Sequence, residues 1–182
     1  LILRRALLTV ALTTGAALVA GPALAEGDPQ AFVQREHQRL VDLLKQPASA
    51  AREGQISKSI DGVLDYDAMV KRAFGEPCPA AVPQCTNHWA ELTAPQKQEV
   101  SDLLRKLVEK NYKKNIQKTL DFEVTFKGTK DGAGEARVRT EAKSKAKPRD
   151  PAVQIDYVVR PAGGSFRVVD IVTEGSSVTK SY

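Results

Sequence analysis

The chain has 182 residues with 27 Lys or Arg and 22 Asp or Glu, which gives a formal net charge of +5. This length suits one domain with a single hydrophobic core. A surface that binds nucleic acid is normally more basic, and its charge is more clustered. The composition therefore favours one folding unit without a nucleic-acid partner.

The first 25 residues have the three parts of a secretory signal peptide. Two arginines supply the positive segment, residues 6–20 are apolar and uncharged, and Ala23-Leu24-Ala25 is a small-x-small cleavage site. A membrane span needs about 20 apolar residues, and Gly21-Pro22 interrupts this stretch. We therefore expect export and cleavage after Ala25, which would leave residues 26–182 with 25 basic and 22 acidic side chains.

Helical patterns come first in this mature chain. Asp28 can cap a helix with Pro29 at its first position, and Pro47 ends that helix. His37 lies at the edge of its apolar face, where we expect a packed or partly exposed ring rather than a ligand. Residues 48–59 fit a weaker helix or a loop.

Two further helices are predicted. Residues 61–75 fit a turn and a short helix, with Asp65 as N-cap and Gly75 as its stop. The strongest helix is predicted over residues 93–118, because its first and fourth residues form a T-x-x-Q capping box. Apolar residues recur along it every three or four positions.

The two cysteines, Cys78 and Cys85, lie between these helices in the segment PCPAAVPQC. Neighbouring cysteines in a Pro-rich loop of an exported chain predict a disulfide. The alternative is a metal site that includes His88, but its spacing fits no common zinc pattern and offers no obvious fourth ligand. We expect the disulfide and no metal.

After Leu120 the apolar period changes from 3.6 to two residues. Alternating segments predict four strands, and Gly163-Gly164 predicts a tight hairpin turn. Helices followed by antiparallel strands indicate an α+β fold. We expect N-terminal helices packed on a curved four-stranded antiparallel sheet, with a cone-shaped apolar cavity between the two layers. The strands are predicted around residues 122–126, 136–142, 153–159 and 166–172.

No catalytic motif is evident: the chain lacks a G-x-S-x-G elbow and a phosphate-binding glycine loop followed by a helix. Asp156 and Asp170 nevertheless lie on apolar strands. Enzymes of the α+β roll type place an Asp base in such a pocket. A small pocket enzyme that uses one of these two carboxylates therefore stays open as an alternative.

A basic run extends from the second predicted strand into the following loop. Such a run can be a solvated edge whose charge deters strand pairing. It can also dock on an acidic protein partner or an anionic membrane surface, so a noncatalytic interaction module is a second alternative. The run consists of Arg137, Arg139, Lys143, Lys145, Lys147 and Arg149.

Four segments, taken together and in this order, are similar to one known family. They read DYDAMVKRAFG, HWAELTAPQKQEVSDLLRKLVEKNY, EARVRTEA and VQIDYVVRPAGGSFRVVDIVTEGSSVTKSY. The chain resembles the MlaC family of periplasmic phospholipid-binding proteins, also called toluene-tolerance auxiliary transport proteins. No single segment is diagnostic, but the ordered set covers most of residues 26–182.

This resemblance implies a monomeric periplasmic carrier, without a cofactor, that binds a phospholipid by its acyl tails. It implies transport between an inner-membrane ABC transporter complex and an outer-membrane lipoprotein complex. The implied fold is an α+β roll similar to nuclear transport factor two-like proteins. Family members continue past the residue matched by Tyr182, so residues 26–182 are expected to form one lipid-binding domain without the C-terminal helices.

We expect the lipid cavity to be lined by apolar side chains of the inward sheet face and of the helices. Ordinary core packing is the alternative for each of them. From the strands we select Phe122, Val124, Phe126, Val138, Ile155, Tyr157, Val159, Val169 and Ile171. From the helices we select Met69, Phe74, Leu104 and Val108.

Overall fold

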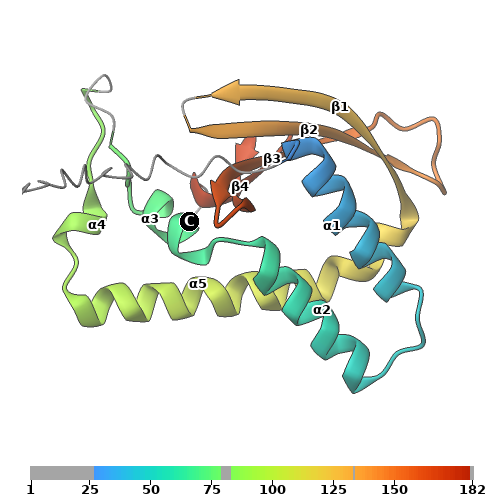
Figure 1. The fold of residues 1–182 in the computed structure, drawn as a ribbon, viewed down its shortest axis with the longest axis horizontal. Coiled ribbons are helices and arrows are strands. Elements are labelled where there is room, and N and C mark those ends of the chain that lie inside the picture. Colours follow the sequence, from blue (N-terminus) through green and yellow to red (C-terminus); the bar gives the residue numbers. More distant parts are fainter. Residues whose placement is uncertain (1–26, 79–82, 133, 181–182) are drawn as a thin grey trace, which may run out of the picture.

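An antiparallel sheet packed against helices forms the fold, which is of the α+β class (Figure 1). The computed structural model describes residues 27–78, 83–132 and 134–180. The predicted signal peptide and Tyr182 lie outside these residues. Within the described ranges, no helix combines the length and the apolar character needed to cross a membrane.

The first two helices begin at side-chain caps. In α1 (Pro29–Leu44), the Asp28 carboxylate accepts a hydrogen bond from the Gln30 amide at 2.9 Å, which confirms the predicted start. Ser49 caps α2 (Ala50–Val63) by accepting from the Arg52 amide at 3.1 Å. For residues 48–59 the sequence allowed either a weak helix or a loop. The structure shows a helix there, and it extends to Val63.

The next helices follow the predicted pattern closely. The Asp65 carboxylate caps α3 (Tyr66–Ala73) by accepting a hydrogen bond from the Ala68 amide at 2.9 Å. After the short α4 (His88–Glu91), the predicted capping box precedes α5 (Ala94–Asn115). The Thr93 amide donates to Gln96 Oε1 at 2.9 Å, and the Gln96 amide donates back to Thr93 Oγ1 at 3.4 Å. A 3₁₀ helix, η1 (Ile116–Asp121), leads directly into the sheet.

The strands form a meander in the order β1-β2-β3-β4-β5, with every neighbouring pair antiparallel. A fifth strand of two residues, which the sequence did not predict, pairs with the end of β4 and is followed by the 3₁₀ helix η2. The predicted turn at Gly163-Gly164 is confirmed, and both residues have positive φ values, 55° and 78°. The bounds are β1 Phe122–Gly132, β2 Glu135–Ser144, β3 Val153–Ala162, β4 Ser165–Thr173, β5 Ser176–Ser177 and η2 Val178–Lys180.

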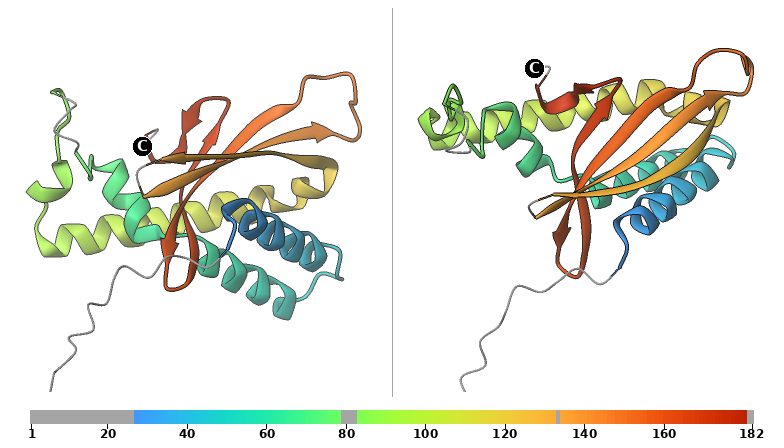
Figure 2. Two further views of the ribbon diagram at one scale, coloured as in Figure 1. Left: turned by 45° about the horizontal axis from the view of Figure 1, so that its top comes forward. Right: turned by 90° about the horizontal axis from the view of Figure 1, so that it is seen from above.

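Helices α1 and α2 lie against one face of this sheet, which we call the inner face (Figure 2). The main core forms there, where Phe32 and Ile60 from the helices pack with Val138, Val159 and Val168 from the strands. The opposite, outer face carries a second cluster, formed mainly where α3 covers β3 and β4. Its members are Ala68, Val158, Val169 and Val172. The sheet therefore has apolar contacts on both faces near β4.

A register shift in the β3–β4 pair changes which side chains of β4 face inward. Val158 pairs with Asp170, whereas Val159 pairs with Val168, so Val169 is an additional residue on β4. Such a bulge interrupts the simple alternation of faces. As a result, Val169 joins the outer cluster, although the alternation predicts it on the same face as Ile171.

Gly75 is expected to be intolerant of any side chain. Its φ is +84°, and an added Cβ would lie 2.1 Å from the carbonyl oxygen of Thr86. Gly75→Ala should therefore lower the free energy of unfolding by more than about 1 kcal/mol, measured by urea denaturation. Gly54→Ala is the matched control, because Gly54 lies within α2 with no atom near the added Cβ. This control should gain roughly 0.5–1 kcal/mol, and equal effects of the two changes would contradict the prediction.

Candidate functional site

A cavity of about 310 Å³ lies between the inner sheet face and the helices α1, α2 and η1. We call it the pocket. Its volume is at the lower end of the range of ~300–1,000 Å³ for ligand sites in proteins. Most of its lining is apolar, as is usual for such sites. The lining residues are Phe32, Val33, Glu36, His37, Leu40, Ser59, Ile60, Val63, Leu64, Lys118, Thr119, Phe122, Val124, Ala142, Ile155, Tyr157, Val168 and Ile171.

The side chains that line the pocket differ in burial. At one end, which we call the closed end, Phe32 is 5% exposed and Val168 is 2% exposed. At the opposite end, where η1 enters β1, Phe122 and Val124 are only partly buried and Lys118 is exposed. We call this second end, formed by Lys118, Thr119, Phe122 and Val124, the mouth.

The two titratable rings in the pocket wall favour their neutral forms. Burial lowers the pKa of His37 below its ordinary value of 6.5, because the charged imidazolium loses solvation there. Its ring also stands edge-on to Phe126, with 6.3 Å between ring centroids. Burial raises the pKa of the Tyr157 hydroxyl for the corresponding reason. The wall of the pocket at neutral pH is therefore suited to an apolar ligand.

Five of the residues selected from the sequence line the pocket: Phe122, Val124, Ile155, Tyr157 and Ile171. Each lies on the inner face and close to the mouth or the middle of the pocket. Their alternation along the strands was the signal that identified them. Together with Ala142 and Val168 they form the sheet side of the site, while the helix side comes from residues that were not selected.

The other selected residues lie elsewhere. Four are buried in the main core, namely Met69, Leu104, Val138 and Val159, and three more pack against that core while partly buried, namely Phe74, Val108 and Phe126. Val169 belongs to the outer cluster. For these side chains the structure shows solid packing rather than contact with the pocket. The difference is tertiary, because it depends on whether side chains from other elements fill the space opposite each residue.

The pocket residues that were not selected come mainly from α1 and α2, with Phe32, Val33, Leu40 and Ile60 as the main apolar contributors. The others, outside these two helices, are Leu64, Lys118 and Thr119 of η1, and Ala142 and Val168 of the sheet. The apolar stripe of α1 was visible in the sequence. It could not be assigned to a pocket, because a stripe that contacts a cavity and a stripe that contacts a solid core have the same helical spacing.

The two strand carboxylates considered as catalytic bases do not line the pocket. Asp156 and Asp170 are 3% and 5% exposed, on the outer face. Arg137 Nη1 lies 3.3 Å from Asp156. Asp170 accepts hydrogen bonds from the Ser177 hydroxyl at 2.6 Å and the Thr179 amide at 3.2 Å. Both carboxylates therefore have partners of their own and act in the packing of the outer face.

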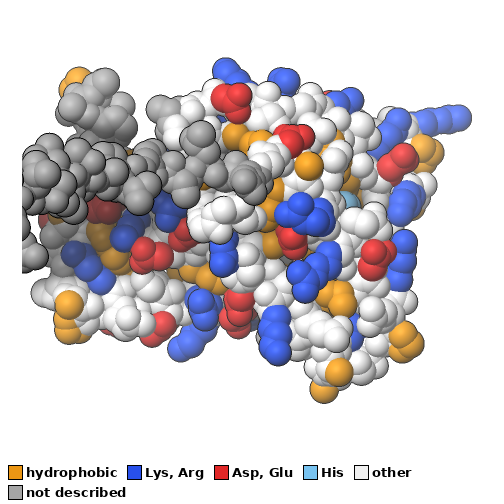
Figure 3. Space-filling view, in the orientation of Figure 1, with side chains coloured by type: hydrophobic (Ala, Val, Ile, Leu, Met, Phe, Trp, Pro, Cys, Tyr) orange, Lys and Arg blue, Asp and Glu red, His pale blue; other side chains and the backbone are white. Residues whose placement is uncertain are grey.

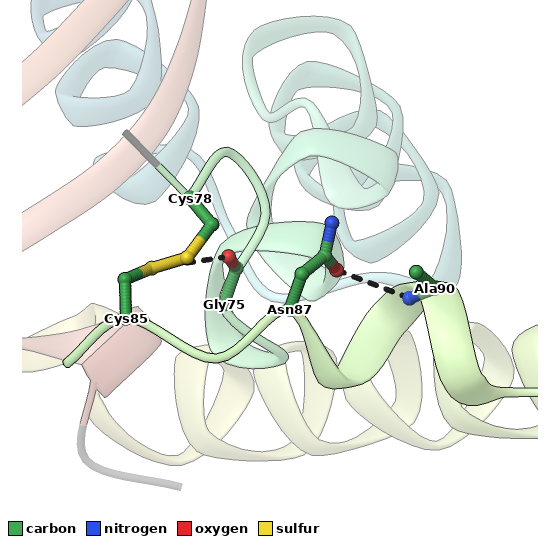
Figure 4. The surroundings of a disulfide bond; sticks show 5 residues. All are labelled: Gly75, Cys78, Cys85, Asn87 and Ala90. Carbon is green, nitrogen blue, oxygen red and sulfur yellow. Dashed lines mark hydrogen bonds between the residues drawn. A yellow bond between two sulfur atoms is a disulfide. The ribbon is translucent and has the colours of Figure 1, made fainter. Parts of the chain in front are cut away.

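The predicted disulfide between Cys78 and Cys85 is present, and its loop joins α3 to α4 (Figure 4). Asn87 lies just after it and caps α4 through the Ala90 amide at 3.0 Å. The middle of the loop, residues 79–82, lies outside the described part of the chain. Among the described residues, no three His, Cys, Asp or Glu side chains lie together in a group that could hold a metal ion.

Fold and site together define an α+β protein with an apolar pocket between its helices and its sheet. The family model of the MlaC protein matches residues 34–182. The chain therefore belongs to the MlaC family.

A similar solved structure is that of the phospholipid-binding protein from Ralstonia solanacearum in complex with a phospholipid. The sequences are 18% identical, and the TM-score is 0.66 over 86% of this chain and 83% of the other. At this identity the comparison supports the fold. A search of curated proteins returned no significant match.

Acidification is expected to destabilise the protein through His37. Because burial lowers its pKa below 6.5, the unfolded chain binds the proton first as the pH falls. The stability contributed by the neutral ring is therefore present above pH 6.5 and is lost as the pH falls through the lower folded pKa. Urea unfolding of wild type and His37→Gln between about pH 5 and 7 tests this. The advantage of the wild type should shrink with acid, and a constant difference would contradict the prediction.

Proposed function

We propose that the protein binds a phospholipid by its acyl chains in the pocket. We also propose that it carries the lipid through the periplasm between outer-membrane and inner-membrane complexes of an ABC-type transport system. The observation that supports binding is the apolar pocket between α1, α2 and the sheet in a member of the MlaC family. The disulfide is consistent with an oxidising compartment such as the periplasm.

Acyl chains match the chemistry of the pocket wall. Each buried methylene contributes about 0.8 kcal/mol, so full burial of the two sixteen-carbon tails of a phospholipid, with about 28 methylenes, would give ~22 kcal/mol before ordering costs. That gross value exceeds the practical limit of affinity, although a cavity of about 310 Å³ takes up only part of the two tails. A lipid bound in this way would leave slowly into water, and its release needs a partner that offers another apolar surface.

The proposed binding mode places the tails toward the closed end and the headgroup at the mouth. Phe32 and Val168 form the closed end, where a charged headgroup would lose its solvation. The exposed Lys118 and the partly buried Thr119 lie at the mouth, where water and a phosphate group can be accommodated. This arrangement needs no catalytic group, and we assign none.

The two alternatives are less well supported by the observations. The pocket enzyme loses its proposed bases, because Asp156 and Asp170 lie on the outer face with their own partners. An interaction module with a solid core does not account for a pocket of about 310 Å³ with an apolar wall. A lipid carrier, unlike these two alternatives, needs an apolar pocket of this kind.

Native mass spectrometry of protein purified from cells tests the proposal, with a variant that fills the pocket. The wild type should retain phospholipid. In Val124→Trp the larger side chain occupies the space for a tail, because Val124 lines the pocket on β1. Bound lipid, and uptake from liposomes, should fall at least tenfold, which corresponds to about 1.4 kcal/mol.

Thr125→Trp is the matched control, because it introduces the same side chain at the next residue, which is exposed. It should retain lipid like the wild type. If the wild type purifies without lipid and takes up none from liposomes, the proposed function is wrong. If the two Trp variants lose lipid equally, the pocket is not the binding site.

A further inference from the structure

The structure divides the basic run of the sequence into two parts. Arg137 and Arg139 lie on the outer sheet face, where Arg137 pairs with Asp156 at 3.3 Å. Lys143 still lies on β2, where it pairs with Glu123 of β1, and from Lys145 onward the run passes into the loop between β2 and β3. The loop cations are thus separate from the sheet face, and their position relative to the pocket decides what they can do.

Hydrogen bonds hold the start of this loop beside the mouth of the pocket. The Lys145 amide donates to the Asp121 carbonyl at 2.9 Å, and Lys145 Nζ donates to the Leu120 carbonyl at 2.8 Å. Ser144 pairs with Phe122, which itself lines the pocket. The loop is therefore anchored to the junction of η1 and β1, where the mouth lies.

Five basic side chains gather at this end of the molecule, and we call them the basic collar. Figure 3 shows Lys and Arg side chains gathered over the β2–β3 loop at the right-hand end of the view. The acidic residues of the same segments are fewer: Asp121, Glu123 and Asp150. The collar consists of Lys118, Lys143, Lys145, Lys147 and Arg149, all of them exposed.

We propose that the basic collar docks the mouth of the pocket on a bilayer surface that contains anionic phospholipid. The proposal rests on the proposed lipid-binding function and adds the surface at which lipid enters or leaves. Each Lys or Arg close to an anionic bilayer strengthens binding by roughly fivefold. With the mouth held against the bilayer, an acyl chain can pass between pocket and membrane without crossing water.

The composition of the collar favours a lipid surface over an acidic protein. Specific protein interfaces depend on aromatic or other large apolar anchors at their centre. The loop from Lys145 to Pro151 contains only alanine and proline among its apolar residues. Cations without such anchors suit a diffuse negative surface, where phosphates can be contacted in many arrangements.

Vesicle co-sedimentation at low ionic strength tests the proposal with the whole protein. The probes are vesicles of equimolar phosphatidylglycerol and phosphatidylcholine, compared with vesicles of phosphatidylcholine alone. The wild type should bind the anionic vesicles at least tenfold more strongly, and added salt should weaken this binding. Lys147→Glu/Arg149→Glu should lower the partition onto anionic vesicles by about 30-fold or more.

Lys130→Glu/Lys180→Glu is the matched control, because it changes the net charge equally at exposed positions outside the collar. It should lose much less binding than the collar variant. An equal loss in both variants, or a wild type that ignores anionic vesicles and binds an acidic protein through the collar, overturns the proposal. Bound lipid is measured in parallel by native mass spectrometry, so failure to dock and failure to carry lipid give different results.

Discussion

The arrangement of the helices around the sheet depends on one residue, Asp65. Its amide donates to the Val168 carbonyl at 2.9 Å, which fixes the link between α2 and α3 to the edge of β4. Its carboxylate caps α3, and one of its oxygens accepts from Arg160 Nη2 at 2.6 Å and Nε at 3.2 Å. Because these bonds act together, the chain can leave α2 on the inner face and continue as α3 toward the outer face.

This crossing explains why the sheet is packed unevenly. Helix α3 contributes Ala68 to the outer cluster beside β4 and Met69 and Val70 to the main core, while α1 and α2 cover the inner face, so the sheet is covered on both faces near Val168. Toward the start of β1 the cover becomes thinner, and Phe122 and Val124 remain partly exposed. The pocket is the part of the inner face that the helices do not fill. Its closed end and its mouth follow from the same asymmetry.

The polar groups on the outer and inner faces of the sheet differ in whether they have partners that satisfy a charged form. On the outer face, the buried Asp156 pairs with Arg137, and the buried Asp170 accepts hydrogen bonds from Ser177 and Thr179, so both carboxylates have partners. In the pocket, His37 and Tyr157 favour their neutral forms because burial penalises their charged forms. Cations are instead found at the mouth. The apolar interior of the pocket and the cations at its mouth together suit a ligand with long apolar tails and a charged headgroup.

The sequence by itself determined most of the helices and the four long strands, because caps, turns and apolar periods are local, but it did not predict β5. Asp28, Asp65 and the box of Thr93 and Gln96 were sufficient to place the starts of three helices, and alternation identified five residues of the pocket wall. It could not separate that wall from solid core residues such as Val138, since both alternate identically. Only the tertiary structure decided this, and it also moved Val169 outward through the bulge in β4. Pocket and core differ in what lies opposite a side chain, and that is set by contacts between distant segments.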